Sequence, residues 1–372
     1  MNIWTVVALI VGLVLLVGGA DFLVKSASKL AATVGIPPLV IGLTVVAFGT
    51  SAPELAVSVQ SVLSGQADIS LGNVVGSNIC NVLLILGLSA IIAPLAVAQQ
   101  LIRLDVPIMV GVSALLLFFG LDGQLNRSDG VILFVGGLLY TLFLLYQSRK
   151  EKDPVVQEEY AQFGETSGST QNIWTNVGLF AVGLAMLVAG SQLLINSAVA
   201  MATAMGASPL IIGLTVVAVG TSLPELATSV AASLRGESDI AVGNVVGSNI
   251  FNILVVLGVA SSLSPTGISI SPSALLFDIP IMLVVAVACL PIFFTGSRVC
   301  RREGGLLLGY YGLYVGYLIV SEIRPASPWV GGLGVVVALL TVLMIALVGW
   351  EAWQTMRNPT LRATKRTSDQ DD

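Results

Sequence analysis

Apolar stretches of about 20 residues recur along the whole chain, and no other feature limits the fold as strongly, because that length lets an α-helix cross a bilayer. Of the 372 residues, 55% are hydrophobic and only 10% are charged, with a mean hydropathy of +0.95. The sequence therefore predicts an all-α polytopic membrane protein. We count eleven spans, at roughly 4–33, 38–63, 70–93, 104–120, 130–148, 173–204, 209–234, 241–264, 274–294, 303–321 and 328–354.

The first span and the scarce metal-binding residue types exclude several alternatives. The opening letters MNIWTVV lack the positive region of a signal peptide, and no convincing cleavage site follows, so we expect a mature helix. The chain has no His and only three scattered cysteines, Cys80, Cys289 and Cys300. This composition predicts neither a disulfide framework nor a transition-metal cluster.

The distribution of positive charges predicts the orientation. Eleven spans put the termini on opposite sides, and an outer N-terminus leaves only Arg127 and Arg324 outside. The other 14 basic residues then face the cytoplasm: Lys25, Lys29, Arg103, Arg149, Lys150, Lys152, Arg235, Arg298, Arg301, Arg302, Arg357, Arg362, Lys365 and Arg366. Cytoplasmic loops carry an excess of Lys and Arg, so we expect the N-terminus outside and the C-terminus inside.

A long internal repeat organises the chain. Residues 42–87 return as residues 213–258, with GLTVVAFGTSAPEL matching GLTVVAVGTSLPEL and 31 of 46 positions identical. Five spans precede residues 149–172 and five aligned spans follow them, and an odd number of spans inverts the second half in the membrane, an arrangement typical of secondary transporters. We therefore predict a first five-helix repeat (1–148), a cytoplasmic linker (149–172), a second, inverted repeat (173–321), an extra transmembrane helix (328–354) and a polar cytoplasmic tail (357–372).

Each repeat places a carboxylate directly after a proline in the middle of a span. Insertion of Glu54 or Glu225 at that depth costs about 2.5–3.5 kcal/mol, so each is a functional-site candidate. Pro53 should kink its helix, and carbonyls freed at membrane depth are tolerated only where they line a cavity. With Thr50 and Ser51 beside them, these groups form an all-oxygen set, which hard cations such as Ca²⁺ and Na⁺ prefer.

The next span of each repeat adds further oxygens. Ser77 and Asn81 share one helix face at a spacing of four, as do Ser248 and Asn252. Two Glu carboxylates carry a charge of −2, which one Ca²⁺ or two Na⁺ would neutralise. A third Na⁺ would have only neutral ligands, and the cycle would then move net charge.

The pair of motifs GTSxPE and GNxxGSNxxN, present twice, resembles the α-repeats of the sodium/calcium exchanger family, part of the cation/Ca²⁺ antiporter superfamily. The resemblance covers the first ten spans and implies a ten-helix exchanger core of two inverted repeats. It implies a monomeric antiporter of a prokaryotic plasma membrane that exports Ca²⁺ in exchange for Na⁺ by alternating access. Such a protein is no enzyme and has no cofactor or nucleic-acid partner. The alternative is a Ca²⁺/H⁺ exchanger of the same superfamily.

The resemblance also implies the ion ligands. They are Glu54, Glu225, Thr50, Thr221, Ser51, Ser222, Ser77, Ser248, Asn81, Asn252, Ala47 and Ala218. The threonines and alanines would contribute mainly backbone carbonyls. The first and sixth spans resemble the family's gating helices. Potassium-dependent relatives carry Asp where this chain has Asn252, which disfavours K⁺ cotransport, and the absence of His disfavours H⁺ coupling.

Other polar residues in or near the spans are interpreted as structural. Asn73, Asn78, Asn244 and Asn249 would hydrogen-bond between helices. Asp68 and Asp239 would be helix N-caps, and Asp105 and Asp278 would be caps or interface charges. Asp21 would pair with Lys25, one turn on. Inverted repeats predict alternating access rather than a channel, and the lack of a triad argues against an intramembrane hydrolase.

Overall fold

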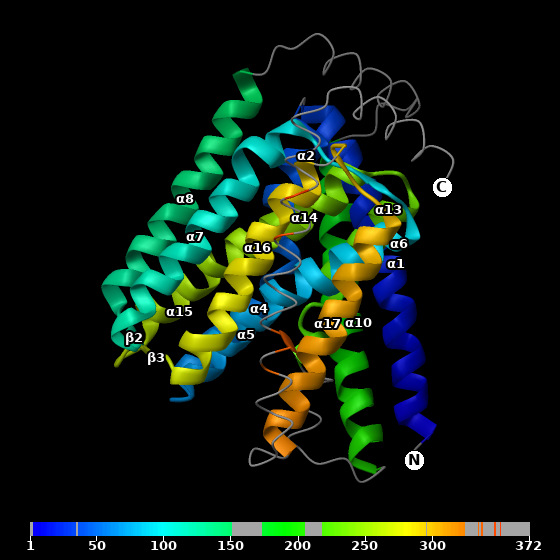
Figure 1. Cartoon of the computed structure of the whole chain (residues 1–372). Coiled ribbons are helices and arrows are strands. Elements are labelled where there is room, and N and C mark those ends of the chain that lie inside the picture. Colours follow the sequence, from blue (N-terminus) through cyan, green and yellow to red (C-terminus); the bar gives the residue numbers. More distant parts are fainter. Residues whose placement is uncertain are drawn as a thin grey trace.

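The computed structural model describes residues 3–34, 36–150, 173–204, 218–294 and 296–323, together with Gly334, Val336, Val337, Ala346 and Trp350. These residues are almost entirely helical (Figure 1), as the apolar runs predict. The predicted linker beyond Lys150, most of the eleventh span, the C-terminal tail and the start of the seventh span lie outside the described residues. Arg149 and Lys150, the first two residues of that linker, are helical.

The first half contains long helices interrupted at polar positions. Its elements are α1 (Ile3–Val34), α2 (Pro38–Ile41), η1 (Gly42–Val46), α3 (Ala47–Thr50), α4 (Ala52–Leu63), α5 (Ala67–Cys80), η2 (Asn81–Leu86), α6 (Gly87–Ile92), β1 (Leu95–Ala96), η3 (Leu101–Asp105), α7 (Val106–Phe119), η4 (Gly120–Asp122), β2 (Gln124–Leu125) and α8 (Arg127–Lys150).

The second half follows the same order. Its elements are α10 (Ile173–Ala204), α12 (Ala218–Gly220), α13 (Leu223–Leu234), α14 (Ser238–Phe251), η6 (Asn252–Leu257), α15 (Gly258–Leu263), β3 (Ile268–Ser269), η7 (Ala274–Asp278), α16 (Ile279–Phe294), β4 (Arg298–Val299) and α17 (Arg301–Ile323).

Eight helices in the described part of the chain are long and apolar enough to cross a membrane, and Pro38–Thr50 with Ala52–Leu63 forms a further, bent span. These nine confirm nine of the predicted spans to within three residues at most ends. The real helices tend to begin earlier than predicted, at Ala67, Leu101, Arg127 and Ser238. The reason is that a first helical turn tolerates polar residues, whereas a hydropathy pattern starts only at the apolar ones.

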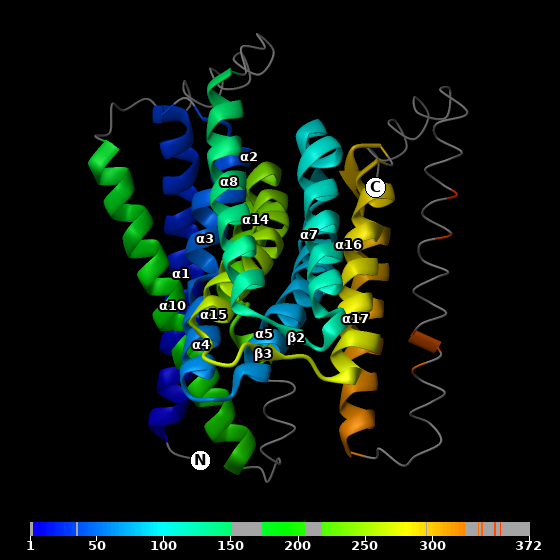
Figure 2. The same ribbon diagram turned by 90° about the vertical axis from the view of Figure 1, so that its left-hand side faces the viewer.

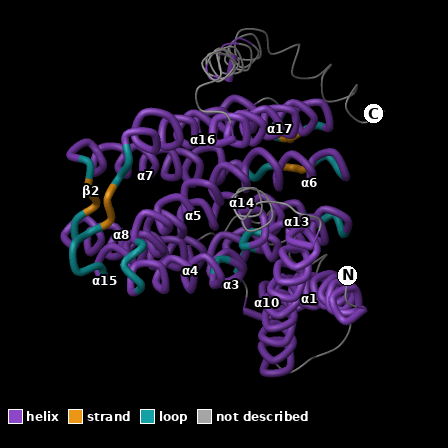
Figure 3. Tube along the Cα trace, turned by 90° about the horizontal axis from the view of Figure 1, so that it is seen from below, coloured by secondary structure: helices purple, strands orange, loops and turns teal. Residues whose placement is uncertain are grey.

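The helices α1 and α10 cross as an antiparallel pair at one edge of the molecule (Figure 3). Glycines make the crossing: a Cβ on Gly12 would lie 2.9 Å from the carbonyl oxygen of Gly190, and one on Gly19 would lie 2.8 Å from that of Gly183. Gly183 and Gly190 are the repeat equivalents of Gly12 and Gly19, 171 residues later. The two backbones therefore touch through a pseudo-two-fold set of small residues, as close helix packing in lipid requires.

The remaining elements repeat this reciprocal pairing between the halves. Gly87 of α6 lies against Gly304 of α17, and Gly258 of α15 lies against Gly130 of α8. The short strands follow the same rule, because β1 pairs with β4 and β2 pairs with β3, antiparallel in both cases. Figure 2 shows β2 and β3 next to one another, near α5.

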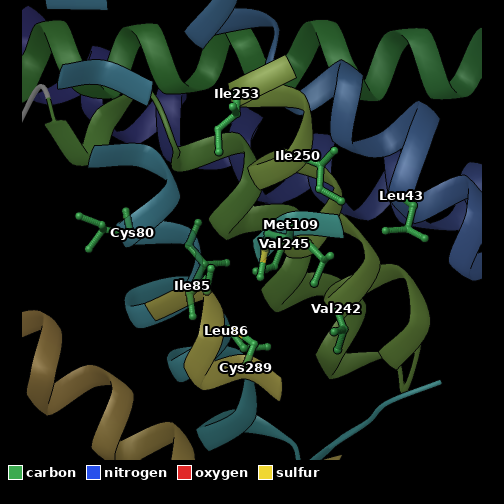
Figure 4. Packing of buried hydrophobic residues seen from close by; sticks show 14 of the residues in the cluster. Leu43, Cys80, Ile85, Leu86, Met109, Val242, Val245, Ile250, Ile253 and Cys289 are labelled. Carbon is green, nitrogen blue, oxygen red and sulfur yellow. The ribbon is translucent and has the colours of Figure 1, made fainter. Parts of the chain in front are cut away.

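The centre of the molecule is a mostly apolar core around α5, α14 and their neighbours (Figure 4). Helix α14 is the most enclosed element, since every residue of Ile240–Phe251 is buried. Met109 and Val245 both belong to this core. The interior is a rigid frame in which buried polar groups must find partners or a ligand.

The charged residues of α1 have no charged counterparts in α10. Asp21 of α1 accepts a hydrogen bond from Lys25 at 2.8 Å, as predicted, and also forms an ion pair with Arg235 beyond α13. At the repeat-equivalent positions of Asp21 and Lys25, Gln192 instead donates to Asn196 at 3.1 Å. This ion-pair cluster is one clear departure from the two-fold relation.

Two predicted roles for aspartates are wrong. Asp105 is fully buried in η3 and makes no cap; its carboxylate accepts hydrogen bonds from Tyr140 at 3.0 Å and Gln100 at 3.2 Å. Asp278 likewise accepts from Tyr314 at 3.1 Å. Asp239 is inside the first turn of α14, whose N-cap residue is Glu237, and Asp68 is inside α5. Tyr140 and Tyr314, which are distant in sequence, donate the hydrogen bonds to Asp105 and Asp278, and the local sequence does not reveal these contacts.

Candidate ion-binding site

The helix of each repeat breaks within the predicted motif. The chain leaves the helix at Ser51 (φ −80°, ψ 7°), and α4 restarts with Pro53 in its first turn, so the two parts meet at 43°. The break recurs at Ser222 (φ −87°, ψ 10°), before Pro224 of α13. The predicted kink is therefore present, and its cause is the missing N–H and the steric clash of proline.

The two glutamates lie in the interior, and each is held by the other half. Glu54 and Glu225 are both 0% exposed. Ser222 donates its hydroxyl to Oε1 of Glu54 at 3.3 Å, and Ser51 donates to Oε1 of Glu225 at 3.0 Å. In each carboxylate the second oxygen, Oε2, has no hydrogen-bond partner. One oxygen of each is thus fixed across the repeat interface and the other is left available.

Six partnerless oxygens form three repeat-related pairs. They are Oε2 of Glu54 and Glu225, Oγ of Ser77 and Ser248, and Oδ1 of Asn81 and Asn252. Five further buried side chains in the described residues have an unpartnered oxygen, but no two of them are repeat equivalents: Ser70, Ser89, Gln147, Asn176 and Thr228. A buried oxygen without a partner costs about 1–3 kcal/mol, so a matched set of six indicates a ligand.

The serines of α5 and α14 face the carboxylates. Ser77 lies beside Glu54 and Ser248 beside Glu225, close enough to influence them, but neither forms a well-aligned hydrogen bond. The two carboxylates are also near enough to repel one another. A cation between them would remove that repulsion.

The threonine hydroxyls are occupied by the opposite repeat. Thr50 donates to Oδ1 of Asn244 at 3.0 Å, and Thr221 donates to Oδ1 of Asn73 at 3.4 Å. Asn244 in turn donates to the backbone carbonyl of Glu225 at 3.3 Å. Both hydroxyl hydrogens are thus used within the protein, and the role of the threonine carbonyls as ion ligands stays a prediction.

Asn73 and Asn244 act as braces around the kink. Asn73 donates to the carbonyl of Glu54 at 3.2 Å and to the hydroxyl of Ser58 at 3.1 Å, and Asn244 makes the equivalent bonds to Glu225 and Ser229. The amides thus bond between helices, as predicted. Their position directly behind the carboxylates could not be read from the sequence.

The two alanines of the predicted set stand on the other side of each break. Ala47 is fully buried, and its carbonyl accepts the N–H of Ser51 at 3.0 Å. Ala218 opens α12, and its side chain lies outside the described set. The Thr50 hydroxyl also lies 3.4 Å from the Ala47 carbonyl oxygen, so a role of that carbonyl as an ion ligand stays a prediction.

Asn81 and Asn252 each begin a π-helical segment, η2 and η6. Single π-helical turns within α-helices are frequent at functional sites. Asn81 donates to Oδ1 of Asn249 at 3.1 Å, and Asn252 donates to Oδ1 of Asn78 at 3.0 Å. Nothing in the composition of these two segments predicts them, and η1, η3 and η7, which are π-helical too, are equally unpredicted.

Hydrogen bonds and close approaches tie Glu54, Glu225, Ser51, Ser222, Ser77 and Ser248 into one cluster. No group of three or more His, Cys, Asp or Glu side chains that could hold a metal occurs in the described residues. The donor set is therefore two carboxylates among neutral oxygens. Such a set suits a hard, weakly held cation rather than a permanently bound transition metal.

Comparison with known proteins assigns the family. A family model described as "Sodium/calcium exchanger protein" matches residues 4–149 and 175–320. The chain belongs to the sodium/calcium exchanger family. The exchanger is accordingly an integral membrane antiporter and not an enzyme, as the sequence predicts.

Individual relatives agree over most of the exchanger. Inner membrane protein YrbG of Escherichia coli (strain K12) is 40% identical over 305 residues, which cover 81% of this chain and 92% of that protein. Sodium/calcium exchanger MaX1 of Methanosarcina acetivorans is 33% identical over 343 residues, 84% of this chain and 97% of that one. A solved structure of the sodium-calcium exchanger NCX_Mj, soaked with Na⁺ and Ca²⁺, matches with a TM-score of 0.71 at 30% identity, covering 87% and 99% of the two chains.

Proposed function

We propose that this protein exchanges Na⁺ for Ca²⁺ across a prokaryotic inner membrane, and that the Glu54–Glu225 cluster binds both ions in turn. The observation that carries the proposal is the two-fold set of six partnerless oxygens around two fully buried carboxylates. Relatives named as sodium/calcium exchangers support the choice of ions. The transported ions are the substrates, and the cycle uses no cofactor.

The ligands in this proposal are the twelve predicted residues. Glu54 and Glu225 bind Ca²⁺ directly, and Ser51, Ser222, Ser77, Ser248, Asn81 and Asn252 add side-chain oxygens. Thr50, Thr221, Ala47 and Ala218 add carbonyls. Six to eight oxygens suit Ca²⁺, whose coordination is flexible, and the same oxygens can be divided among smaller Na⁺ sites.

The net charge of the loaded site determines which ions can replace one another. One Ca²⁺ brings the two carboxylates to neutrality, and so do two Na⁺. A third Na⁺ would be bound by neutral oxygens, giving a loaded site of charge +1 and an electrogenic cycle. Asn252 supplies no third carboxylate, so K⁺ should not be required.

We assign the halves as predicted, residues 1–148 and 173–321, with a cytoplasmic linker at 149–172 and an extra helix at 328–354. The distribution of basic residues supports an outer N-terminus. The antiparallel α1–α10 pair, which packs against α13 and the rest of the core, is the candidate moving element. A single chain carries both halves of the site, so the monomer is sufficient.

Flux measurements in proteoliposomes test the proposal. An imposed Na⁺ gradient should drive Ca²⁺ uptake against its own gradient, and replacement of Na⁺ by choline at constant pH should stop it. Continued uptake driven by a pH gradient alone would instead establish the Ca²⁺/H⁺ alternative. If one net charge moves per cycle, a valinomycin-imposed potential should shift the transport equilibrium by about 2.3 kcal/mol per 100 mV.

A further inference from the structure

We infer that Asn78 and Asn249 are positioning residues that fix which end of the Asn252 and Asn81 amides points into the ion site. The inference rests on the proposed function, because it concerns how the same site presents oxygen to a cation. Neither residue belongs to the predicted ligand set, and both are only 2% exposed.

The geometric problem is that an asparagine amide has two chemically opposite ends. Its oxygen can bind a cation, whereas its NH₂ group can only donate and would repel one. The two ends have nearly the same shape, so packing alone does not choose between them. A hydrogen-bond partner of fixed polarity must make the choice.

Asn78 has such a partner. Its Nδ2 donates to the backbone carbonyl of Asn249 at 3.1 Å and also approaches the thioether sulfur of Met282 at 3.7 Å. A backbone carbonyl can only accept, and a thioether is at most a weak acceptor, so the NH₂ end of Asn78 must face them. Its Oδ1 is then turned toward Asn252.

The orientation of Asn78 in turn fixes the orientation of Asn252. Oδ1 of Asn78 accepts from Nδ2 of Asn252 at 3.0 Å, which fixes the NH₂ end of Asn252 away from the site. The remaining atom, Oδ1 of Asn252, is buried and has no partner. The backbone carbonyl of Asn249 therefore sets, through two amides, the oxygen that Asn252 offers to an ion.

The other half repeats the device. Asn249 donates to the sulfur of Met109 at 3.4 Å, and its Oδ1 accepts from Nδ2 of Asn81 at 3.1 Å. Oδ1 of Asn81 is left without a partner, as in the first case. Each half therefore orients the amide of the other. The anchor of Asn249 is only a thioether, so the Asn78–Asn252 arm is the more strongly fixed.

A carboxylate at position 252 would not need Asn78 to orient it. Both of its ends are oxygens, and one of them would face Oδ1 of Asn78. The anchored Asn78 thus favours an amide at 252 and disfavours Asp, which links it to the ion specificity of the site.

A double-mutant cycle read by equilibrium ⁴⁵Ca²⁺ binding to the full-length protein in nanodiscs tests the inference. Asn78→Ala in the otherwise native chain should free the Asn252 amide to turn and weaken Ca²⁺ binding about tenfold, the equivalent of one lost hydrogen bond. In the Asn252→Asp background the same change should cost less than about threefold or improve binding, because orientation no longer matters. A packing role alone would cost the same in both backgrounds.

The reciprocal cycle, Asn249→Ala with and without Asn81→Asp, provides the test if Asn78→Ala does not fold. Equal costs in the two backgrounds would overturn the inference while leaving the proposed function intact. Absence of Ca²⁺ binding by the native protein would overturn the proposed function and this inference with it.

Discussion

Replacement of one central carboxylate by an amide should change which ion the site prefers. Glu225→Gln keeps the shape of the side chain and its Oε1 acceptor for Ser51, but removes one negative charge. Ca²⁺ would then leave a net charge of +1 in a fully buried site, whereas a single Na⁺ would leave it neutral. Removal of one partner from a buried charge pair costs about 3–5 kcal/mol, or roughly 150- to 4,000-fold in affinity.

Equilibrium ⁴⁵Ca²⁺ binding, with Na⁺ as competitor, measures the effect. Glu225→Gln and Glu54→Gln should each lose Ca²⁺ affinity by that factor, and the number of Na⁺ ions in the competition curve should fall by one. Glu303→Gln is the matched control: Glu303 accepts the N–H of Cys300 at 2.8 Å at the start of α17, and Gln can accept it too. Ca²⁺ affinity within tenfold of native in either site variant would refute the charge argument.

The remaining predictions concern the contacts between the halves. Ser51→Ala and Ser222→Ala each remove a hydrogen bond to a buried carboxylate, so Ca²⁺ binding should weaken by about 1.5–3 kcal/mol in titrations. Weaker binding in only one of the two variants would contradict the two-fold site. Gly19→Ala would place a Cβ 2.8 Å from the Gly183 carbonyl oxygen, so it should slow transport strongly. The control is Gly178→Ala, whose Cβ would meet nothing within 4 Å and should leave the transport rate unchanged. Equal rates in the two variants would show that the helix crossing tolerates extra bulk. Asp21→Asn removes the partner of Arg235 and Lys25, and since those groups are partly exposed the change should be worth at most about 1 kcal/mol. The Asp21→Asn change should shift the ratio of inward to outward transport rates, and this shift should become smaller in high salt. A shift of the same size in high salt would argue against an ion pair.

How much the sequence predicts depends on whether a feature is local. Spans, the proline kink and the buried glutamates follow from runs of letters, so nine spans and both kinks are found where expected. The repeat adds one long-range fact, that equivalent residues occupy equivalent places, and this made the pairing of Glu54 with Glu225 predictable. It could not show that Ser51 bonds to the glutamate of the other half rather than to its own.

The failures share a cause. Asp105 precedes a proline near a span entry and looks like a cap, yet Tyr140, 35 residues away, satisfies it. The π-helical turns at Asn81 and Asn252 have no residue signature of their own, so the sequence does not predict them. The direction of an amide likewise depends on its partner's polarity, which only a three-dimensional arrangement defines.

The reciprocal bonds explain why such a site needs two halves. Glu54 is held by Ser222, Glu225 by Ser51, and the amides of Asn81 and Asn252 by asparagines of the opposite half. In the proposed site neither repeat alone contains a complete ligand shell, so we expect the ion to bind on the pseudo-two-fold axis between them. An ion on that axis has the same surroundings when approached from either side of the membrane. We therefore propose that alternating access requires no rebuilding of the ligands, only movement of the α1–α10 pair. The departure from symmetry at Asp21 lies outside the site, where we expect it to bias that movement without altering affinity.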